Sequence, residues 1–457
     1  MKRYGIEVSL KNVPELDPAF CPIGRYNRSF LTGAKRPIDL AIERADGQMA
    51  AVYTYIHGTA ERAEADRYYI ERLVKTLLWM KGGSRIYVND RAMAAFLRDT
   101  YAAGGQREFD RDFMSRVFER PFEVLYAEKV PENVDAPKAI GGHLNGCRIG
   151  FDAGGSDRKV SAVLNGETVY SEEVVWYPKD NADPTYHYDG IVAALRSAAA
   201  RLPRVDAVGV SSAGIYINDR VMSASLFLKV PQALQDTQVK DIFIRAITDT
   251  FGQIPFCVIN DGDVSALAGA MSLGDTNILG IAMGTSEAAG FVDEQGRVTG
   301  WLNELAFAPV DVSPDAMADE WSGDIGCGVK YFSQDAVIKL APRADIELDE
   351  KLSPAEKLKV VQERMEKDDP RAAKIYRSIG VYLGHTLAYY YDLYACRHVL
   401  LLGRVMSGKG GDLILGTCRQ VLHDEYPELA GKLLPTLPDE KFRRVGQSIA
   451  AAGLPEI

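Results

Sequence analysis

Apolar and polar residues alternate most clearly between Arg148 and Val175. Asn165–Gly166 interrupts this alternation, and Asn-Gly between two such runs is the strongest short signal for a β-hairpin, because both turn residues must take positive φ. We therefore predict three strands in this stretch. The first two are joined by a turn of a different character, Asp152–Ala153–Gly154–Gly155–Ser156.

The two glycines of this turn remove Cβ atoms where successive backbone N–H groups could approach a bulky anion. We expect positive φ at Gly154 or Gly155. Ser156 adds a hydroxyl donor, and the Asp152 carboxylate at the strand end suits a hydrated Mg²⁺ ion. The same residues also describe an ordinary glycine turn with a solvated aspartate. The pattern alone leaves phosphate binding and a plain turn equally open.

The first 145 residues predict a small α+β unit. Residues 1–37 show no clear period and are expected to be extended. Alternation on both sides of Asp46–Gly47 predicts a second hairpin, and the apolar spacing from Glu64 to Met80 predicts a helix. Val130 to Gly146 is rich in proline and glycine, which is typical of a linker.

After this linker, strands alternate with helices, which is typical of an α/β protein. The predicted strand Phe256–Ile259 runs into Asn260–Asp261. The order of strand, hydroxyl-bearing glycine turn and strand returns at Gly284–Thr285–Ser286, and this repetition predicts a duplicated fold. Three further predictions are a helix at Thr237–Phe251, a strand at Val298–Leu302 and a helix at Pro314–Trp321.

Composition narrows the class of protein. The net charge of −10 argues against a nucleic-acid partner, and the first 140 residues contain no basic cluster. The six cysteines are scattered without a C-x-x-C pair, as expected for reduced thiols. The N-terminus lacks the apolar core of a signal peptide, and no run is long enough to span a bilayer. We predict a cytoplasmic protein with no membrane or nucleic-acid partner; a homodimer is left open.

Five segments, in this order, resemble the sugar-kinase, actin and Hsp70 superfold, and within it the ROK family (repressors, open reading frames and kinases). They are FDAGGS, GVSSAG, INDGDVSALAG, GIAMGTSEAAGF and VLLLGRVMSGKGG. The resemblance covers about residues 148–457. It implies an α/β, two-lobed, duplicated actin-like or ribonuclease H-like ATPase fold with lobes at 146–275 and 276–457. The α+β domain at 1–145 is an addition of unknown role.

The resemblance implies transfer of a phosphoryl group from ATP, with Mg²⁺, to a hydroxyl of a sugar or sugar-like substrate. Asp261 would accept the hydroxyl proton; the competing interpretation is a helix N-cap. For Glu304, a solvated loop acid is an equal alternative to sugar binding. The ATP and phosphate site would contain Asp152, Gly154, Gly155, Ser156, Gly284, Thr285, Ser286 and Gly403. The substrate site would contain Gly214, Ser225, Asn260, Asp261 and Glu304.

Four positions depart from the family pattern. Phe307 replaces a histidine expected after Glu304, and Cys327 alone remains of a cysteine cluster that holds structural zinc. One thiolate cannot complete four-coordinate zinc, so we predict that no zinc is bound. Ser225 replaces an asparagine, and Glu287 would bring a negative charge near the phosphates. These departures leave a non-catalytic, sugar-sensing regulatory protein as the alternative to a kinase.

Overall fold

The chain forms two compact units in the computed structural model, which describes residues 1–138 and 140–457, without the side chains of 440–445. Ala139, in the predicted linker, lies outside the described residues. The division of the chain into domains at 1–145, 146–275 and 276–457 stays a prediction. The first unit comprises Met1–Ala136, Ile281–Ala289 and Trp301–Leu437, and the second comprises Pro137–Gly280, Gly290–Gly300 and Pro438–Ile457.

A five-stranded sheet in the order β13-β10-β7-β8-β9 forms the centre of the second unit. β7, β10 and β13 are parallel, whereas β8 and β9 extend the sheet antiparallel. Asn165 and Gly166 have φ of 48° and 88°, which confirms the predicted hairpin turn. The strands are β7 (Cys147–Ala153), β8 (Asp157–Leu164), β9 (Glu167–Val175), β10 (Ala207–Ser212), β11 (Ile215–Ile217), β12 (Arg220–Ser223) and β13 (Phe256–Asn260).

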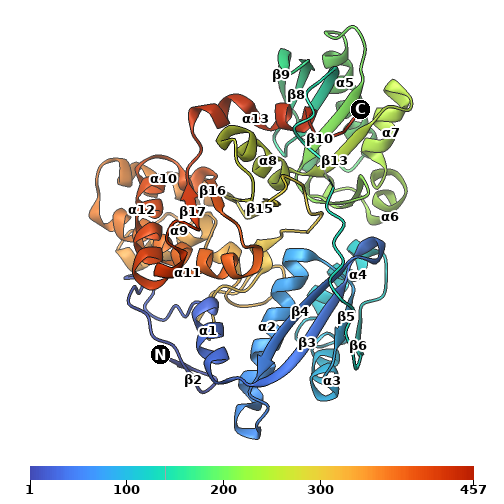
Figure 1. Ribbon diagram of the computed structural model, residues 1–457. Helices are drawn as coiled ribbons and strands as arrows, with labels where there is room; N and C mark the ends of the chain where they lie inside the picture. The colour runs from blue at the N-terminus through green and yellow to red at the C-terminus, as the bar shows by residue number, and fades with distance from the viewer. Residues whose placement is uncertain (139) are drawn as a thin grey trace. The chain divides into compact units, whose positions relative to one another are not determined.

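Helices cover both faces of this sheet (Figure 1). On one face, apolar side chains of α5 and α7 pack with those of the strands in one buried core. On the other face, α8 and α13 pack together, and the α13 backbone lies directly against Gly150 and Gly209. Those two positions have no room for a Cβ atom, so glycine is required there. The helices are α5 (Pro184–Ala199), α6 (Gln232–Leu234), α7 (Ile242–Phe251), α8 (Asp261–Leu273) and α13 (Glu440–Ala452).

The N-terminal part of the first unit contains a four-stranded mixed sheet in the order β4-β3-β5-β6. Asp46 and Gly47 have positive φ and connect β3 to β4, as predicted. The long helix α2 is buried along most of its length, and its buried side chains include charged residues as well as apolar ones. The elements are β1 (Lys2–Arg3), β2 (Ile6–Glu7), α1 (Ile23–Gly33), β3 (Arg36–Glu43), β4 (Met49–Ile56), α2 (Ala63–Lys81), β5 (Arg85–Val88), α3 (Arg91–Thr100), α4 (Glu108–Phe118) and β6 (Glu123–Tyr126).

A second four-stranded sheet has the order β15-β14-β16-β17. β14 and β15 confirm the strand–turn–strand repeat that the sequence predicted. The long helix α11 packs against α12, and Gly24 of α1 lies against Tyr389 of α11. The elements are β14 (Ile278–Met283), β15 (Glu287–Val292), α9 (Gln334–Leu340), α10 (Pro354–Glu366), α11 (Pro370–Tyr394), β16 (His398–Leu402), α12 (Gly408–Glu425) and β17 (Leu434–Thr436).

Two predictions of local structure are wrong because side chains or distant packing override the local pattern. Residues 1–37 are not all extended: α1 forms there and buries Ile23, Tyr26 and Phe30. No helix forms at Pro314–Trp321, since the Asp319 side chain accepts a hydrogen bond from the Ser322 N–H and makes a turn instead.

Two further predictions are wrong in extent. At Val298–Leu302 the structure has only two isolated bridges, from Val298 to Lys138 and to Val292. The helix predicted at Thr237–Phe251 is α7, which begins at Ile242 after a π-helical turn at Gln235–Val239. None of the helices among the described residues is long and apolar enough to cross a membrane.

Candidate functional site

Two acidic residues stand at the carboxyl edge of the sheet in the second unit. Asp152 lies in β7 opposite Ser211 of β10, and Ser212 of β10 lies opposite Asn260 of β13. Asp261 follows directly as the first residue of α8. Because neighbouring strands are about 4.8 Å apart, β7 and β13 are separated by roughly 10 Å. An α/β protein usually binds its ligand at this edge of the sheet.

Few cations lie near these carboxylates: Lys159 of β8 stands opposite Asp152 and acts to lower its pKa. In the described part of the chain, Asp152 and Asp261 form no ion pair. Burial raises the pKa of Asp152 to about 7, the charge of Asp261 adds to the rise, and the Ser211 hydroxyl opposes it. Burial also raises the pKa of Asp261, while backbone N–H groups at the start of α8 partly oppose that shift. Uncompensated acids of this kind are typical of functional sites.

Asn260, rather than Asp261, is the N-cap of α8. Its side-chain oxygen accepts a hydrogen bond from the Gly262 N–H at 2.7 Å, and its Nδ2 donates to the Gly214 carbonyl at 2.6 Å. Gly214 has φ of 134° and contacts Ser223, so this position requires glycine. The capping interpretation of Asp261 is therefore wrong, and its carboxylate is left available for other chemistry.

The glycine turn after Asp152 differs from the prediction in its backbone. Neither Gly154 nor Gly155 has positive φ. Space is restricted instead: a Cβ on Gly154 would lie 2.7 Å from the Asp157 carbonyl oxygen, and one on Gly155 would lie 2.7 Å from Lys179 Nζ. The ammonium group of Lys179 thus lies over the turn that is predicted to hold phosphates. The sequence reasoning missed this residue, because nothing in its spacing links it to the turn.

In the first unit, the turn at Gly284, Thr285 and Ser286 is tight, since the Gly284 N–H donates to the Ser286 carbonyl at 3.0 Å. Gly403 has φ of 93° and lies against the backbone of Met283, where a side chain would clash. The next residue, Arg404, donates from Nη2 to the Thr285 hydroxyl at 2.9 Å. Arg404 is a second cation that the sequence reasoning missed, although it directly follows Gly403.

Ser225 lies in a short 3-10 helix, Ser225–Phe227, of the second unit and is half-buried. Glu304, in the first unit, is half-buried and starts another short 3-10 helix, Leu305–Phe307. The ring of Phe307 stacks on Trp79 of α2 with 4.2 Å between ring centroids. The position expected to hold a histidine therefore belongs to an aromatic cluster.

Glu287 does not place a bare charge at the turn. It is buried at the start of β15, and neither carboxylate oxygen has a hydrogen-bond partner among the described residues. Its carboxylate lies against the Cα of Gly328. Burial raises the pKa of Glu287 to about 8, with a further rise from Glu304. This shift favours the protonated, neutral form of Glu287, which opposes the expectation of a negative charge near the phosphates.

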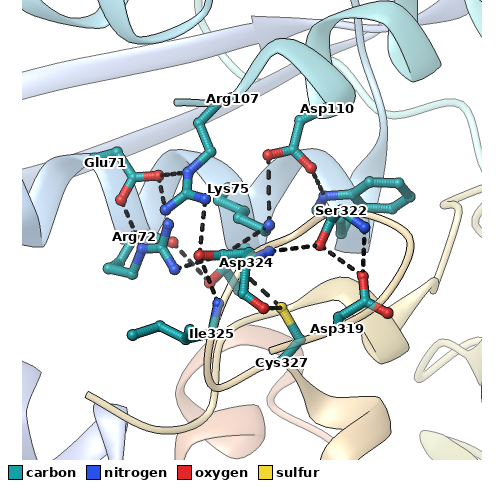
Figure 2. A network of polar contacts seen from close by, with 12 residues as sticks. Glu71, Arg72, Lys75, Arg107, Asp110, Asp319, Ser322, Asp324, Ile325 and Cys327 are labelled. Atoms are coloured by element: carbon teal, nitrogen blue, oxygen red, sulfur yellow. Dashed lines mark hydrogen bonds and ion pairs between the residues drawn. The ribbon is translucent and has the colours of Figure 1, made fainter. Parts of the chain in front are cut away.

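A network of buried ion pairs lies in the same unit and was not predicted (Figure 2). Its centre is Asp324, whose oxygens are 2.8 Å from Arg72 Nη1, 2.8 Å from Lys75 Nζ and 2.8 Å from Arg107 Nη1. Burial acts to raise the pKa of Asp324, but Arg72 and Lys75 outweigh it and hold that pKa below its ordinary value. Three cations face three carboxylates, all less than a tenth exposed: Arg72, Lys75, Arg107, Glu71, Asp110 and Asp324.

Cys327 is part of this network. Its thiol lies 3.8 Å from an Asp324 carboxylate oxygen, and burial raises the pKa of the thiol to about 12. In the absence of a metal ion, burial thus favours the neutral thiol over the thiolate. Ion pairs occupy the surroundings of the one cysteine that matched the zinc-binding cluster.

Parallel strands ending in acids, a duplicated strand–turn–strand unit and helices on both sheet faces define an α/β protein of the actin-like ATPase fold. The chain belongs to the ROK family, whose sequence profile matches residues 148–421. Among curated proteins, none matches the chain significantly.

Solved structures of this family resemble the chain. A ROK hexokinase from Thermus thermophilus is 18% identical with a TM-score of 0.51, covering 67% of this chain and 97% of that one. A putative sugar kinase from Cytophaga hutchinsonii is 16% identical with a TM-score of 0.50, covering 67% of this chain and 99% of that one. A ROK family transcriptional regulator, a homologue of the E. coli MLC protein, is 16% identical with a TM-score of 0.54, covering 79% of this chain and 87% of that one. At these identities the likeness shows the fold alone.

Proposed function

We propose that this protein is an ATP-dependent carbohydrate kinase that transfers a phosphoryl group to a hydroxyl of a sugar or sugar-like substrate. The observation that carries the proposal is the pair Asp152 and Asp261, held at the carboxyl edge of one sheet and without an ion pair among the described residues. A structural role would favour pairing such acids with cations, since an unpaired acid in a half-buried position lowers stability.

Asp261 accepts the proton of the attacking sugar hydroxyl. A base works best when its pKa approaches the operating pH, and burial moves the pKa of Asp261 in that direction. Asn260 is oriented by its bonds to Gly262 and Gly214, so its side chain is fixed beside the base. Glu304, Gly214 and Ser225 are proposed to contact the sugar.

ATP is the proposed phosphoryl donor. The turns at Gly154–Gly155–Ser156 and Gly284–Thr285–Ser286, together with Gly403, provide backbone N–H groups and hydroxyls for its phosphates. The half-buried Asp152, which forms no ion pair among the described residues, fits a hydrated Mg²⁺. When bound, the ion would neutralise charge on the phosphates. The absence of zinc, the cytoplasmic location, the homodimer and the absence of nucleic-acid binding stay predictions.

The test is ADP release over a panel of hexoses, amino sugars and polyols, with the wild type and Asp261→Asn. For the best substrate we expect kcat to fall about 10²–10⁴-fold in the variant, the usual contribution of a general base. Asp249→Asn, on the exposed side of α7, controls for the loss of one negative charge and should keep full activity. Unchanged turnover in Asp261→Asn would show that another group is the base.

A second candidate is a sugar-sensing regulator without turnover. Phe307 favours the regulator, because its ring stacks on Trp79 and cannot form a hydrogen bond with a sugar. Calorimetry separates the two functions: sugar binding together with no measurable ATP affinity would support the regulator. Saturable binding of both ligands would support the kinase.

A further inference from the structure

The last turn of α2 binds the backbone at Glu304. The N–H groups of Asn303 and Glu304 donate to the carbonyls of Met80 and Trp79, each at 2.9 Å. The last four carbonyls of a helix have no partner within it, so these bonds satisfy groups that α2 leaves free. Stacking of Trp79 on Phe307 adds a side-chain contact on the same side.

The other side of this segment contacts the loop that follows Asp324. The Gly328 N–H donates to the Ala308 carbonyl at 2.9 Å, and the Val310 N–H donates to the Gly326 carbonyl at 2.8 Å. A Cβ on Gly328 would lie 2.5 Å from the Leu305 carbonyl oxygen, so the two segments are in close backbone contact. Movement of 326–328 would therefore move the residues next to Glu304.

The same loop returns to α2 through Asp324. Lys75 and Arg72, one and two turns before Trp79, both pair with this carboxylate, and Lys75 is fully buried (Figure 2). The contacts thus form a closed ring that runs from α2 to 303–310, on to 324–328, and back to α2.

We propose that Lys75 and Asp324 are positioning residues for Glu304, and that the N-terminal region acts in this protein as a rigid support of the sugar site. The role assigned to Glu304 rests on the proposed function, but the ring itself does not. A carboxylate with three buried cations around it sets the loop in one place, because any displacement leaves a buried charge unpaired. The backbone at Glu304 is then fixed from both sides.

Hydrogen exchange tests the ring without reference to activity. In Asp324→Asn we expect the amides of Asn303, Glu304 and Gly328 to exchange about tenfold faster or more, since local opening becomes easier. The matched control is Asp17→Asn: Asp17 is also a buried acid of the first unit, bonded to Arg343 and Tyr382, but lies outside the ring. Unchanged exchange at 303–304 in Asp324→Asn, or an equal increase in Asp17→Asn, would overturn the proposal.

Kinetics test the consequence for the sugar. We expect Asp324→Asn to raise the KM for sugar about tenfold while the KM for ATP and the pH profile of kcat stay as in the wild type. The double variant Lys75→Met/Asp324→Asn removes one charge of each sign and keeps the cluster neutral. If it regains stability and the KM for sugar stays high, positioning is supported. If the KM recovers with stability, the ring only stabilises the fold and the proposal fails.

The two proposals fail in different ways. A wild-type protein that neither binds nor phosphorylates any sugar would contradict the proposed function, while the exchange experiment would still decide whether α2 fixes the backbone at Glu304. Normal sugar turnover with unchanged exchange in Asp324→Asn would leave the kinase intact and remove the positioning role.

Discussion

Asp152 and Asp324 are both aspartates in protected surroundings, and their environments have opposite effects. Asp324 is surrounded by Arg72, Lys75 and Arg107, and its pKa is held below the ordinary value despite burial. Asp152 has Asp261 nearby and no ion pair, and its pKa is raised to about 7. Ionised Asp324 therefore stabilises the fold, whereas ionised Asp152 destabilises it. A protein keeps an acid of the second kind when the acid has another task.

The comparison also separates the roles of the two groups of acids. The network around Asp324 joins α2 and α4 to the loop at 319–327, so its charges satisfy one another. The acids of the second unit are satisfied by backbone groups only in part, which leaves them able to bind a cation or a proton. Acids that are paired with buried cations therefore indicate a structural role, whereas buried acids without an ion pair indicate a functional one.

The largest effect on stability should come from Asp324→Asn. Removing one partner of a buried ion cluster leaves cations unpaired, and we expect a loss of about 3–5 kcal/mol in the free energy of unfolding, measured with urea. The control is Asp241→Asn, which breaks an exposed pair with Arg220 and should cost less than about 1 kcal/mol. Equal small losses in both would mean that the network does not hold the loop.

A smaller effect is expected from Gly155→Val, and it should appear in ATP affinity. Because φ at Gly155 is ordinary and the nearest obstacle is the flexible end of Lys179, stability should hardly change. The branched side chain would fill the space over the turn, and we expect ATP affinity to fall about tenfold, or ~1.4 kcal/mol. Calorimetry with ATP and a urea titration on the same protein measure both quantities.

Gly166→Val is the matched control for this prediction. Gly166 has φ of 88°, so valine there should cost about 1–3 kcal/mol of stability through backbone strain and leave the ATP affinity of the folded protein intact. If Gly155→Val behaves like Gly166→Val, the turn after Asp152 is only a turn.

No measurable effect is expected from metal chelation. The Cys327 thiol lies among ion pairs, so EDTA or a stronger zinc chelator should leave the melting temperature unchanged, and elemental analysis should find less than one zinc per chain. A drop in melting temperature on chelation, reversed by zinc, would show that a structural zinc site exists.

Local chemistry made several features predictable from the sequence. Asn165–Gly166 can form a tight turn wherever it occurs. Asp152 was predicted from its place at a strand end and Asp261 from the family resemblance, and the roles of both stay predictions. The competing interpretation of Asp261 as the N-cap was wrong: Asn260 caps α8, and either side chain can cap a helix. The conformation of Gly154–Gly155 was also wrong, because glycine allows positive φ without requiring it.

The remaining features depend on contacts between distant parts of the chain. Lys75 and Asp324 are separated by about 250 residues, and no spacing or period connects them. Lys179 lies beside Gly155 only after β8 and β9 have folded. Helix α1 is short and contains two glycines and two arginines, so the sequence alone does not reveal the apolar face that packs against α11 in the fold. Long-range packing of this kind leaves no signal in one sequence.

The central claim is that Asp152 is held unpaired at a cost to stability, and the pH dependence of that cost tests it most directly. A pKa raised from about 3.9 in the unfolded chain to about 7 in the fold means that stability falls as pH rises between these values. Asn at this position cannot ionise. The free energy of unfolding of Asp152→Asn, relative to the wild type, should therefore grow by about 2–3 kcal/mol between pH 5 and pH 8. A difference that stays constant over this range would contradict the account.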